Sequence, residues 1–346
     1  AASSAFAGVN VGMGFNRGFF VPFAYDGTDA KAGISTSWGA EPRVGVSFSA
    51  ASEQVGVVAD VKFDGGNVAV NDNAYIWVKP TSWFKMNIGQ SFDDTLRGNA
   101  CFGSWDWLRP GNILGEDLIF TRVCNNPLAG AWAPLQGAIL MLDPIEGLHI
   151  SVGLPTGYGI AANWEDLVAK TQVQAGYTIA DVAQIKAQWI GAGKNVDDEI
   201  EGQIEVAASV KAIEGMTLDV GAKFRTVEDA PIDVAVFWGM PVAGLALNAN
   251  ALVSIPTADN ADMSLAIGAG VGYDLGNGMG VGADVRYSQT FDDVTDPAIA
   301  FAAWFDKGIA NGTLGVAVQG ATKTGIRDIA ASDFSFAVPV RVQCFF

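Results

Sequence analysis

The sequence has few charged residues, very few histidines and cysteines, and no long apolar run. Only 16% of its 346 residues are charged, and its mean hydropathy is +0.26. Charged residues approach about a quarter of a typical water-soluble protein. The longest uncharged run, residues 234–258, is interrupted by Pro241, Asn248, Asn250 and Pro256. No membrane-spanning helix is therefore expected, although the composition is apolar.

The three cysteines and the single histidine exclude structural zinc, because no CxxC or Cys/His ligand spacing exists. Cys101 and Cys124 share one long connection, so a disulfide between them is expected in an oxidising compartment. Cys344 then stays an unpaired apolar residue. The alternative is three unrelated thiols. The first residues, 1–4, lack the features of a signal peptide and resemble the mature end of an exported protein.

Basic residues are also scarce. The chain has 20 Lys and Arg against 37 Asp and Glu, which gives a net charge of -17. No basic patch can neutralise phosphates, so nucleic acid is excluded as a partner. Acidic clusters at residues 93–94, 197–199 and 292–293 are expected to be solvated loops. Alternatively, they concentrate cations at a channel mouth or bind loop calcium through their carboxylates. We therefore predict that the channel is modestly selective for cations.

Alternation of apolar and polar residues is the dominant pattern. From Phe334 to Phe346 every second residue is apolar, whereas the interleaved positions include Arg341. A period of two indicates a strand with one apolar and one polar face. Because the pattern persists along the chain, the sequence predicts an all-β fold: a closed antiparallel transmembrane β-barrel formed by a single domain, residues 1–346. We expect about 18 strands, with 16 possible. Pro339 cannot donate a ladder hydrogen bond and predicts a bulge or weak pairing.

The polar face of these strands is expected to line the pore. Opposite charges inside a ring of strands need water or each other, so a hydrated interior is predicted. The predicted pore-lining residues are Asp60, Lys62, Lys85, His149, Lys186, Glu201, Glu205, Asp219, Lys223, Arg225, Asp284, Arg286 and Arg341.

Short and long connections alternate along the chain. The short ones include Asn277-Gly278, a dipeptide typical of a tight hairpin. Short periplasmic turns and long extracellular loops are typical of outer-membrane barrels. The predicted long connections are residues 16–42, 91–132, 155–169, 191–199, 289–297 and 323–333.

The connection of residues 91–132 is far longer than an ordinary one, so it should be functional, internally stapled or mobile. We expect it to bend inward, so that its charges set the narrowest point of the channel. The alternative is a compact external cap. The candidate constriction residues are Asp93, Asp94, Arg97, Arg109, Glu116, Asp117 and Arg122.

Signals of enzymatic chemistry are weak, and no enzyme is predicted. His149 lies near no Ser or Cys nucleophile motif and is expected to be a solvated lumen residue. Glycine-rich stretches at residues 268–272 and 278–282 lie within predicted strands with no helix after them, so they fail the context of a dinucleotide site. No catalytic residue, metal site or cofactor is expected apart from the possible loop calcium.

The alternating C-terminal strand that ends in Phe346 resembles the terminal signal of bacterial outer-membrane barrels. Residues 73–98 resemble barrel proteins of spirochaete outer membranes, such as those of treponemes. Residues 91–132 occupy the third long-loop position, where general porins carry the loop that folds into the channel. The resemblance implies a porin of the bacterial outer membrane, passive diffusion of small hydrophilic solutes and ions, and homotrimers. Two alternatives stay open: a structural or adhesive surface protein with a plugged barrel, and an outer-membrane hydrolase.

Overall fold

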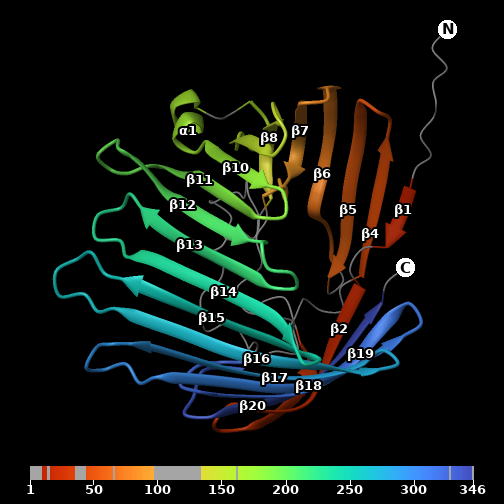
Figure 1. Ribbon diagram of the computed structural model, residues 1–346, viewed down its shortest axis with the longest axis vertical. Helices are drawn as coiled ribbons and strands as arrows, with labels where there is room; N and C mark the ends of the chain where they lie inside the picture. The colour runs from red at the N-terminus through yellow and green to blue at the C-terminus, as the bar shows by residue number, and fades with distance from the viewer. Residues whose placement is uncertain are drawn as a thin grey trace.

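The computed structural model describes residues 10–13, 16–35, 44–64, 67–96, 134–160, 163–326 and 329–344. A single antiparallel sheet of 20 strands dominates them (Figure 1). The strands are β1 (Asn10–Met13), β2 (Asn16–Tyr25), β3 (Ala30–Ile34), β4 (Val44–Ala51), β5 (Val55–Asp64), β6 (Asn67–Thr81), β7 (Phe84–Ser91), β8 (Leu135–Leu142), β9 (Leu148–Leu154), β10 (Gln172–Ile179), β11 (Ala183–Lys194), β12 (Ile200–Val210), β13 (Thr217–Arg225), β14 (Ile232–Val242), β15 (Leu245–Ile255), β16 (Ser264–Gly276), β17 (Met279–Thr290), β18 (Ala298–Ile309), β19 (Gly312–Thr322) and β20 (Ser335–Cys344).

The sheet follows the order of the chain. From β4 to β20 each strand pairs antiparallel with the next one in sequence. At the N-terminus β1 pairs with β4, whereas β2 pairs with both β3 and β20. Figure 1 shows the sheet curling round, with the red β2 beside the blue C-terminal strands.

The strand number differs from the sequence prediction of about 18. The predicted strands coincide with β1 and β4–β20, and the two additional strands are β2 and β3. Both lie within residues 16–42, where the sequence predicted a long loop, and that prediction is wrong. The reason is a register shift between Phe20 and Phe23, on either side of Pro22, which breaks the alternation on which the prediction depended.

Pro339 of β20 lies opposite this irregularity. The β19–β20 ladder continues in the same register on either side of Val338 and Pro339 but does not pair them. The shift on β2 occurs at the same level of β20. The predicted bulge or weak pairing at Pro339 is therefore confirmed.

The faces of the sheet are reversed relative to a water-soluble sheet. On β10 the side chain of Tyr177 is 46% exposed, whereas those of Gln172 and Gln174 are each only 2% exposed. On β11 Ile185 is 59% exposed beside Lys186 at 2%. In a soluble sandwich the apolar face is buried and the polar face meets water. The predicted alternation is confirmed, with the polar face turned inward.

Tight turns join several hairpins. Asn277 and Gly278, where the sequence predicted a tight hairpin, have φ angles of +53° and +71°, and a type I′ turn requires positive φ at both positions. Ala243 and Gly244 adopt the same combination, +52° and +84°, between β14 and β15. Alanine is unusual at positive φ, so the sequence did not indicate this turn.

The helix α1 (Trp164–Ala169) lies in the predicted connection of residues 155–169. The side chain of Asn163 caps it by accepting from the Glu165 amide, and Glu165 and Asp166 lie in its first turn. Within the described ranges, no helix is long and apolar enough to cross a membrane.

Candidate functional site

Buried polar side chains cover the inner face of β9–β12. We call this surface the polar wall. Each of its members is less than 10% exposed, which is unusual for side chains that water would otherwise solvate. Its residues are His149, Ser151, Gln172, Gln174, Gln184, Lys186, Gln188 and Glu205.

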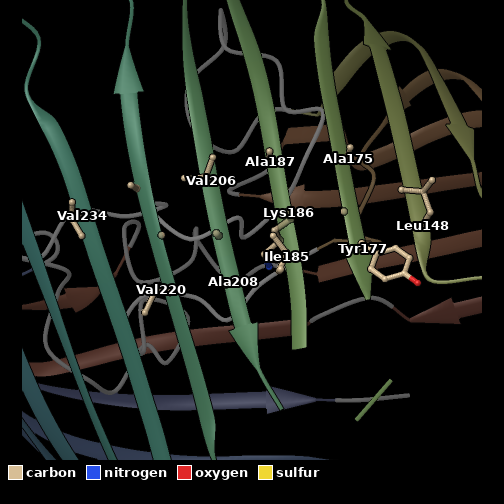
Figure 2. A pocket seen from close by; sticks show the side chains of 14 residues that line it. Leu148, Ala175, Tyr177, Ile185, Lys186, Ala187, Val206, Ala208, Val220 and Val234 are labelled. Carbon is tan, nitrogen blue, oxygen red and sulfur yellow. The ribbon is translucent and has the colours of Figure 1, made fainter. Parts of the chain in front are cut away.

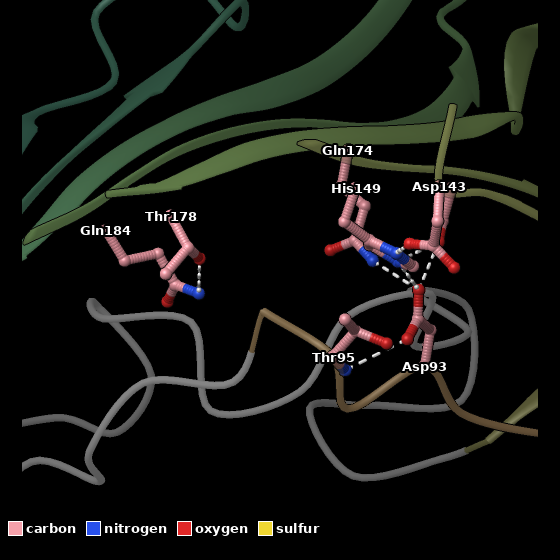
Figure 3. A network of polar contacts seen from close by, with 8 residues as sticks. Asp93, Thr95, Asp143, His149, Gln174, Thr178 and Gln184 are labelled. Atoms are coloured by element: carbon pink, nitrogen blue, oxygen red, sulfur yellow. Dashed lines mark hydrogen bonds and ion pairs between the residues drawn. The ribbon is translucent and has the colours of Figure 1, made fainter. Parts of the chain in front are cut away.

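The segment directly after β7, residues 92–96, lies against the polar wall. Asp93 points into it from this segment, as Figure 3 shows. Its Oδ2 accepts from the Gln174 Nε2 at 2.6 Å and from the Ser151 hydroxyl, and it lies 2.8 Å from the His149 Nε2. The Nδ1 of His149 lies 2.7 Å from the Asp143 Oδ1, so each ring nitrogen faces a carboxylate. These contacts hold the start of the long connection inside the sheet.

Asp93 is only 3% exposed, and its environment favours the charged carboxylate. Burial by itself raises the pKa of Asp93. Its hydrogen bonds with His149 and Ser151, the charge of His149 and the Thr95 amide outweigh burial and lower that pKa to about 2. A buried carboxylate with several donors makes strong, charge-assisted hydrogen bonds. Asp93 is therefore an ionised anchor at neutral pH.

Leu96 supplies a second anchor. Its backbone oxygen accepts from the Lys186 Nζ at 3.0 Å, and its side chain is 1% exposed. A Cβ atom added at Gly176 would come within 2.5 Å of the Leu96 Cδ2, so the absence of a side chain on β10 permits this close approach. The segment thus packs on the polar wall as well as bonding to it.

A cleft of about 500 Å³ shows how far the segment reaches. Thr95 and Leu96 line it together with Trp83, which directly precedes β7, and with Asp143 from the turn before β9. The chain leaves the C-terminal end of β7 at Ser91. Leu96, only five residues later, nevertheless lies beside Trp83 at the N-terminal end of the same strand. Residues 92–96 therefore fold back along the inner face.

Of the predicted constriction residues, the described part of the chain includes only Asp93 and Asp94. Asp93 lies on the polar wall, whereas Asp94 is exposed. The others lie outside the described residues, as do both predicted disulfide cysteines: Arg97, Arg109, Glu116, Asp117, Arg122, Cys101 and Cys124.

All predicted pore-lining residues alternate with the exposed apolar series and share the inner face. Six of them are buried: His149, Lys186, Glu205, Asp219, Asp284 and Arg286. The others are partly exposed: Asp60, Lys62, Lys85, Glu201, Lys223, Arg225 and Arg341.

The expectation that His149 is solvated is wrong, because the segment of residues 92–96 covers it. The role of Ser151, Gln174 and Asp143 was missed, since a contact between residues far apart in sequence leaves no local signal.

Several inner charges pair with polar neighbours, as expected. Arg225 bonds to Asp233 and Arg341 to Asp306, both at 2.6 Å. The Asn73 amide donates to Asp60 at 2.7 Å, and Gln188 and Gln203 donate to Glu205 at 2.5 and 2.7 Å. The Lys85 ammonium lies 5.3 Å from the centre of the Trp77 ring, within cation–π distance. Mutual pairing therefore satisfies much of the inner charge.

Part of the inner face of β2 and β18–β20 is an apolar cluster instead, and we call this cluster the apolar wall. Ile326 and Ile329 of the β19–β20 connection pack on it and are 1% and 7% exposed. Their backbones bond reciprocally at 3.0 and 2.9 Å. The sequence predicted residues 323–333 as an extracellular loop and missed this packing. The wall itself consists of Phe19, Val21, Ala24, Ala300, Ala317, Ala321 and Ala337.

The outer face of β9–β14 is shallowly hollowed, with a volume of about 740 Å³. Figure 2 shows small side chains such as Ala175 and Ala187 between larger ones such as Tyr177 and Val206. The labelled side chains other than Lys186 belong to the outward apolar series. Because Lys186 points inward and is 2% exposed, the outward surface of this hollow is apolar.

Ser151, His149 and Asp143 superficially resemble a hydrolase triad. The His149 Nε2 lies 2.9 Å from the Ser151 Oγ, and Asp143 holds the other ring nitrogen. Ser151 is however 0% exposed, and its hydroxyl donates to Asp93. A nucleophile needs access to substrate and a base to take its proton, and this geometry favours a structural role.

The described residues hold no group of three His, Cys, Asp or Glu side chains that could bind a metal ion. Loop calcium, which the sequence supported only as an alternative to solvated acidic loops, stays a hypothesis.

The structure defines a class of fold, a single antiparallel sheet with its polar face turned inward and its apolar face outward. Solved outer-membrane porins share this fold. OccK1 (OpdK) of Pseudomonas aeruginosa matches with a TM-score of 0.60 and 11% identity over 99% of this chain and 100% of that one. OpdL of Pseudomonas aeruginosa matches with a TM-score of 0.59 and 9% identity over 98% of each chain.

An anion-selective porin from Comamonas acidovorans matches with a TM-score of 0.54 and 10% identity over 98% of this chain and 100% of that one. No family model and no curated protein matches the sequence. At these identities the similarity establishes the fold.

Proposed function

We propose that this chain is a porin of a bacterial outer membrane, a closed barrel around a water-filled channel for passive diffusion of small hydrophilic solutes and ions. The reversal of the two faces carries the proposal. An exposed apolar band is stable only where hydrocarbon meets it, and the polar inner face then needs water or internal partners. The porin fold of the chain supports this function.

The pairings at the N-terminus support closure of the barrel. Strands β1 and β2 pair with β4 and β3 on one side, while β2 pairs with β20 on the other. The Asn16 Oδ1 also accepts from the Gly45 amide at 2.6 Å and joins β2 to β4. If β1–β2 and β3–β4 each count as one wall strand, the 20 strands of the sheet form a barrel of about 18.

We infer that residues 91–132 fold into the channel rather than cap it. The support is the segment of residues 92–96, which Asp93 and Leu96 anchor to the polar wall. The short turns then face the periplasm and the longer connections the exterior. Trimer assembly, a disulfide between Cys101 and Cys124, and the likeness of residues 73–98 to spirochaete barrels stay hypotheses.

A planar-bilayer recording of the purified protein tests the proposal. Stable conductance steps support a channel, and a folded protein that gives none contradicts it. Because acidic residues outnumber basic ones by 37 to 20, we expect a reversal potential of modest cation preference across a salt gradient. A clear anion preference would contradict that part.

One observation favours a second candidate, a structural or adhesive surface protein with a plugged barrel. Six of the predicted pore-lining residues are buried, so part of the interior is filled. Shortening residues 97–130 separates the candidates. A constriction loop predicts a larger conductance after the deletion. A plug predicts conductance only after the deletion, and no change refutes both roles of the loop.

A further inference from the structure

A second recess, of about 430 Å³, lies on the inner face where β15–β18 meet the connections opposite the Asn277–Gly278 turn. Ser264 of β16 pairs in register with Thr290 of β17, and Ser288 lies one inner position further along β17. Thr324 contributes a fourth hydroxyl from the β19–β20 connection. All four are partly exposed. Their hydroxyls have no hydrogen-bond partner within the described ranges, so they are available to a ligand.

The charged groups at this recess already have partners. The Lys323 Nζ lies 2.6 Å from Asp333 and 2.9 Å from Asp296. The hydrogen bonds to Asp333 and Asp296 also raise the pKa of Lys323, so this side chain keeps its proton. A cation held between two carboxylates offers little to an anionic solute. The groups that remain available are therefore neutral.

Two other polar residues of the lining, Gln289 and Thr295, bond to Tyr287 and Asp292, and the remaining lining residues are apolar. Leu252, Ala266 and Ala298 lie on the same inner face as the hydroxyls. A hydroxyl both donates and accepts hydrogen bonds, whereas a carboxylate only accepts and an ammonium only donates. Hydroxyls that lie beside small apolar side chains complement a ring-shaped solute. Such a solute carries hydroxyl groups at the edge of its ring and C–H groups on the faces of the ring. The volume is within the range of about 300–1,000 Å³ that small-molecule sites have.

We propose that this recess binds a neutral polyhydroxylated solute, of the size of a mono- or disaccharide, as the solute enters the barrel. That the solute is on its way into the barrel rests on the proposed function. The chemical class of the solute rests on the lining of the recess alone. We expect this binding to be weak, because water competes with the solute for hydrogen bonds to half-exposed hydroxyls. A weak site raises the local solute concentration without preventing release.

The test compares two matched triple variants. Ser264→Ala, Ser288→Ala and Thr290→Val remove three hydroxyls from the recess and keep its shape. Ser47→Ala, Ser49→Ala and Thr217→Val remove the same three groups from the inner faces of β4 and β13. Glucose and sucrose are the probes, and sodium acetate and lysine are the charged comparisons. Block of the single-channel current is measured in bilayers, and saturation-transfer NMR measures binding to the detergent-folded protein.

We expect both sugars to reduce the current of the wild type and of the control variant. In the recess variant the half-blocking sugar concentration should rise by about tenfold, because three bonding groups are lost. An equal response of both variants, or stronger block by acetate or lysine than by the sugars, overturns the proposal. Sugar binding seen by NMR and lost only in the recess variant, in a protein that never conducts, supports the recess and contradicts the channel.

Discussion

Two inner surfaces of the sheet hold a covering segment by opposite means. On the polar wall, residues 92–96 are held by directional bonds, chiefly those of Asp93 with His149 and Gln174. On the apolar wall, Ile326 and Ile329 are held by packing in one cluster with Phe19, Val21 and several alanines. Charge-assisted bonds fix one geometry, whereas apolar burial is non-directional and depends on area. The comparison shows that the inward face of one continuous sheet can serve both as a polar binding surface and as a small core.

The largest effect should come from the carboxylate of the polar wall. In Asp93→Ala, His149, Ser151 and Gln174 lose their common partner. Removing one partner of a buried pair destabilises by about 3–5 kcal/mol. Urea unfolding in lipid vesicles should show this loss, and the channel current should become noisier as the segment detaches.

Asp94→Ala is the control for that change, since it removes the same charge from the exposed neighbour. Its stability should stay within about 0.5 kcal/mol of the wild type. Equal losses in the two variants would mean that charge rather than the contacts of Asp93 matters.

The apolar wall should respond to loss of volume instead. Ile326→Ala removes a side chain that is 1% exposed, and the transfer and cavity terms together amount to about 2–4 kcal/mol. The same urea titration measures it. Ile213→Ala, at a site that is 50% exposed, should change stability by less than about 0.5 kcal/mol. If Ile326→Ala were as mild, the connection would not be packed on the wall.

A smaller effect is expected where the segment of residues 92–96 touches β10. Gly176→Ala places a methyl group within 2.5 Å of the Leu96 side chain, which must shift. Overpacking of this kind costs about 1–2 kcal/mol. Gly280→Ala, whose nearest contact would be at 3.8 Å, is the control and should be nearly neutral. Thermal unfolding in detergent compares the two variants. Similar midpoint temperatures would show that the Leu96 side chain does not pack closely against β10.

The smallest effect is expected from a change of pH. Acid should affect the polar wall, which contains the carboxylate of Asp93, and not the apolar wall, whose side chains do not titrate. In the folded chain the pKa of Asp93 is lowered from its ordinary value of 3.8 to about 2. Its stabilisation is therefore complete above pH 3.8 and is lost as pH falls towards 2. The wild-type current should be steady from pH 7 to 4 and change between pH 4 and 2.

Asp93→Asn carries no titratable group at this position, so its current should lack the change between pH 4 and 2. An identical acid response in wild type and Asp93→Asn would show that another group controls it.

Much of the fold could be predicted from sequence because strand alternation is a local pattern. The exposed series on β10 and β11 and the turn at Asn277 follow directly from it. Strands β2 and β3 could not be predicted, because Pro22 and the shift between Phe20 and Phe23 interrupt the period. The apolar wall was also hidden, since alanine is compatible with either face of a strand.

The candidate site was only half predictable for a different reason. His149 and Asp93 are unusual residues and were identified separately. Their contact joins positions 56 residues apart, and it depends on the direction in which a connection folds. Nothing in the local sequence around either residue encodes that direction.

The central claim is that hydrocarbon contacts one face of each strand while the other faces the interior. Spin labels placed singly at each position of β10, in lipid vesicles and with the native cysteines replaced, test it most directly. The account predicts that oxygen accessibility peaks at Val173, Ala175 and Tyr177 and is low at Gln172 and Gln174. Uniform accessibility, or peaks at the glutamines, would contradict it.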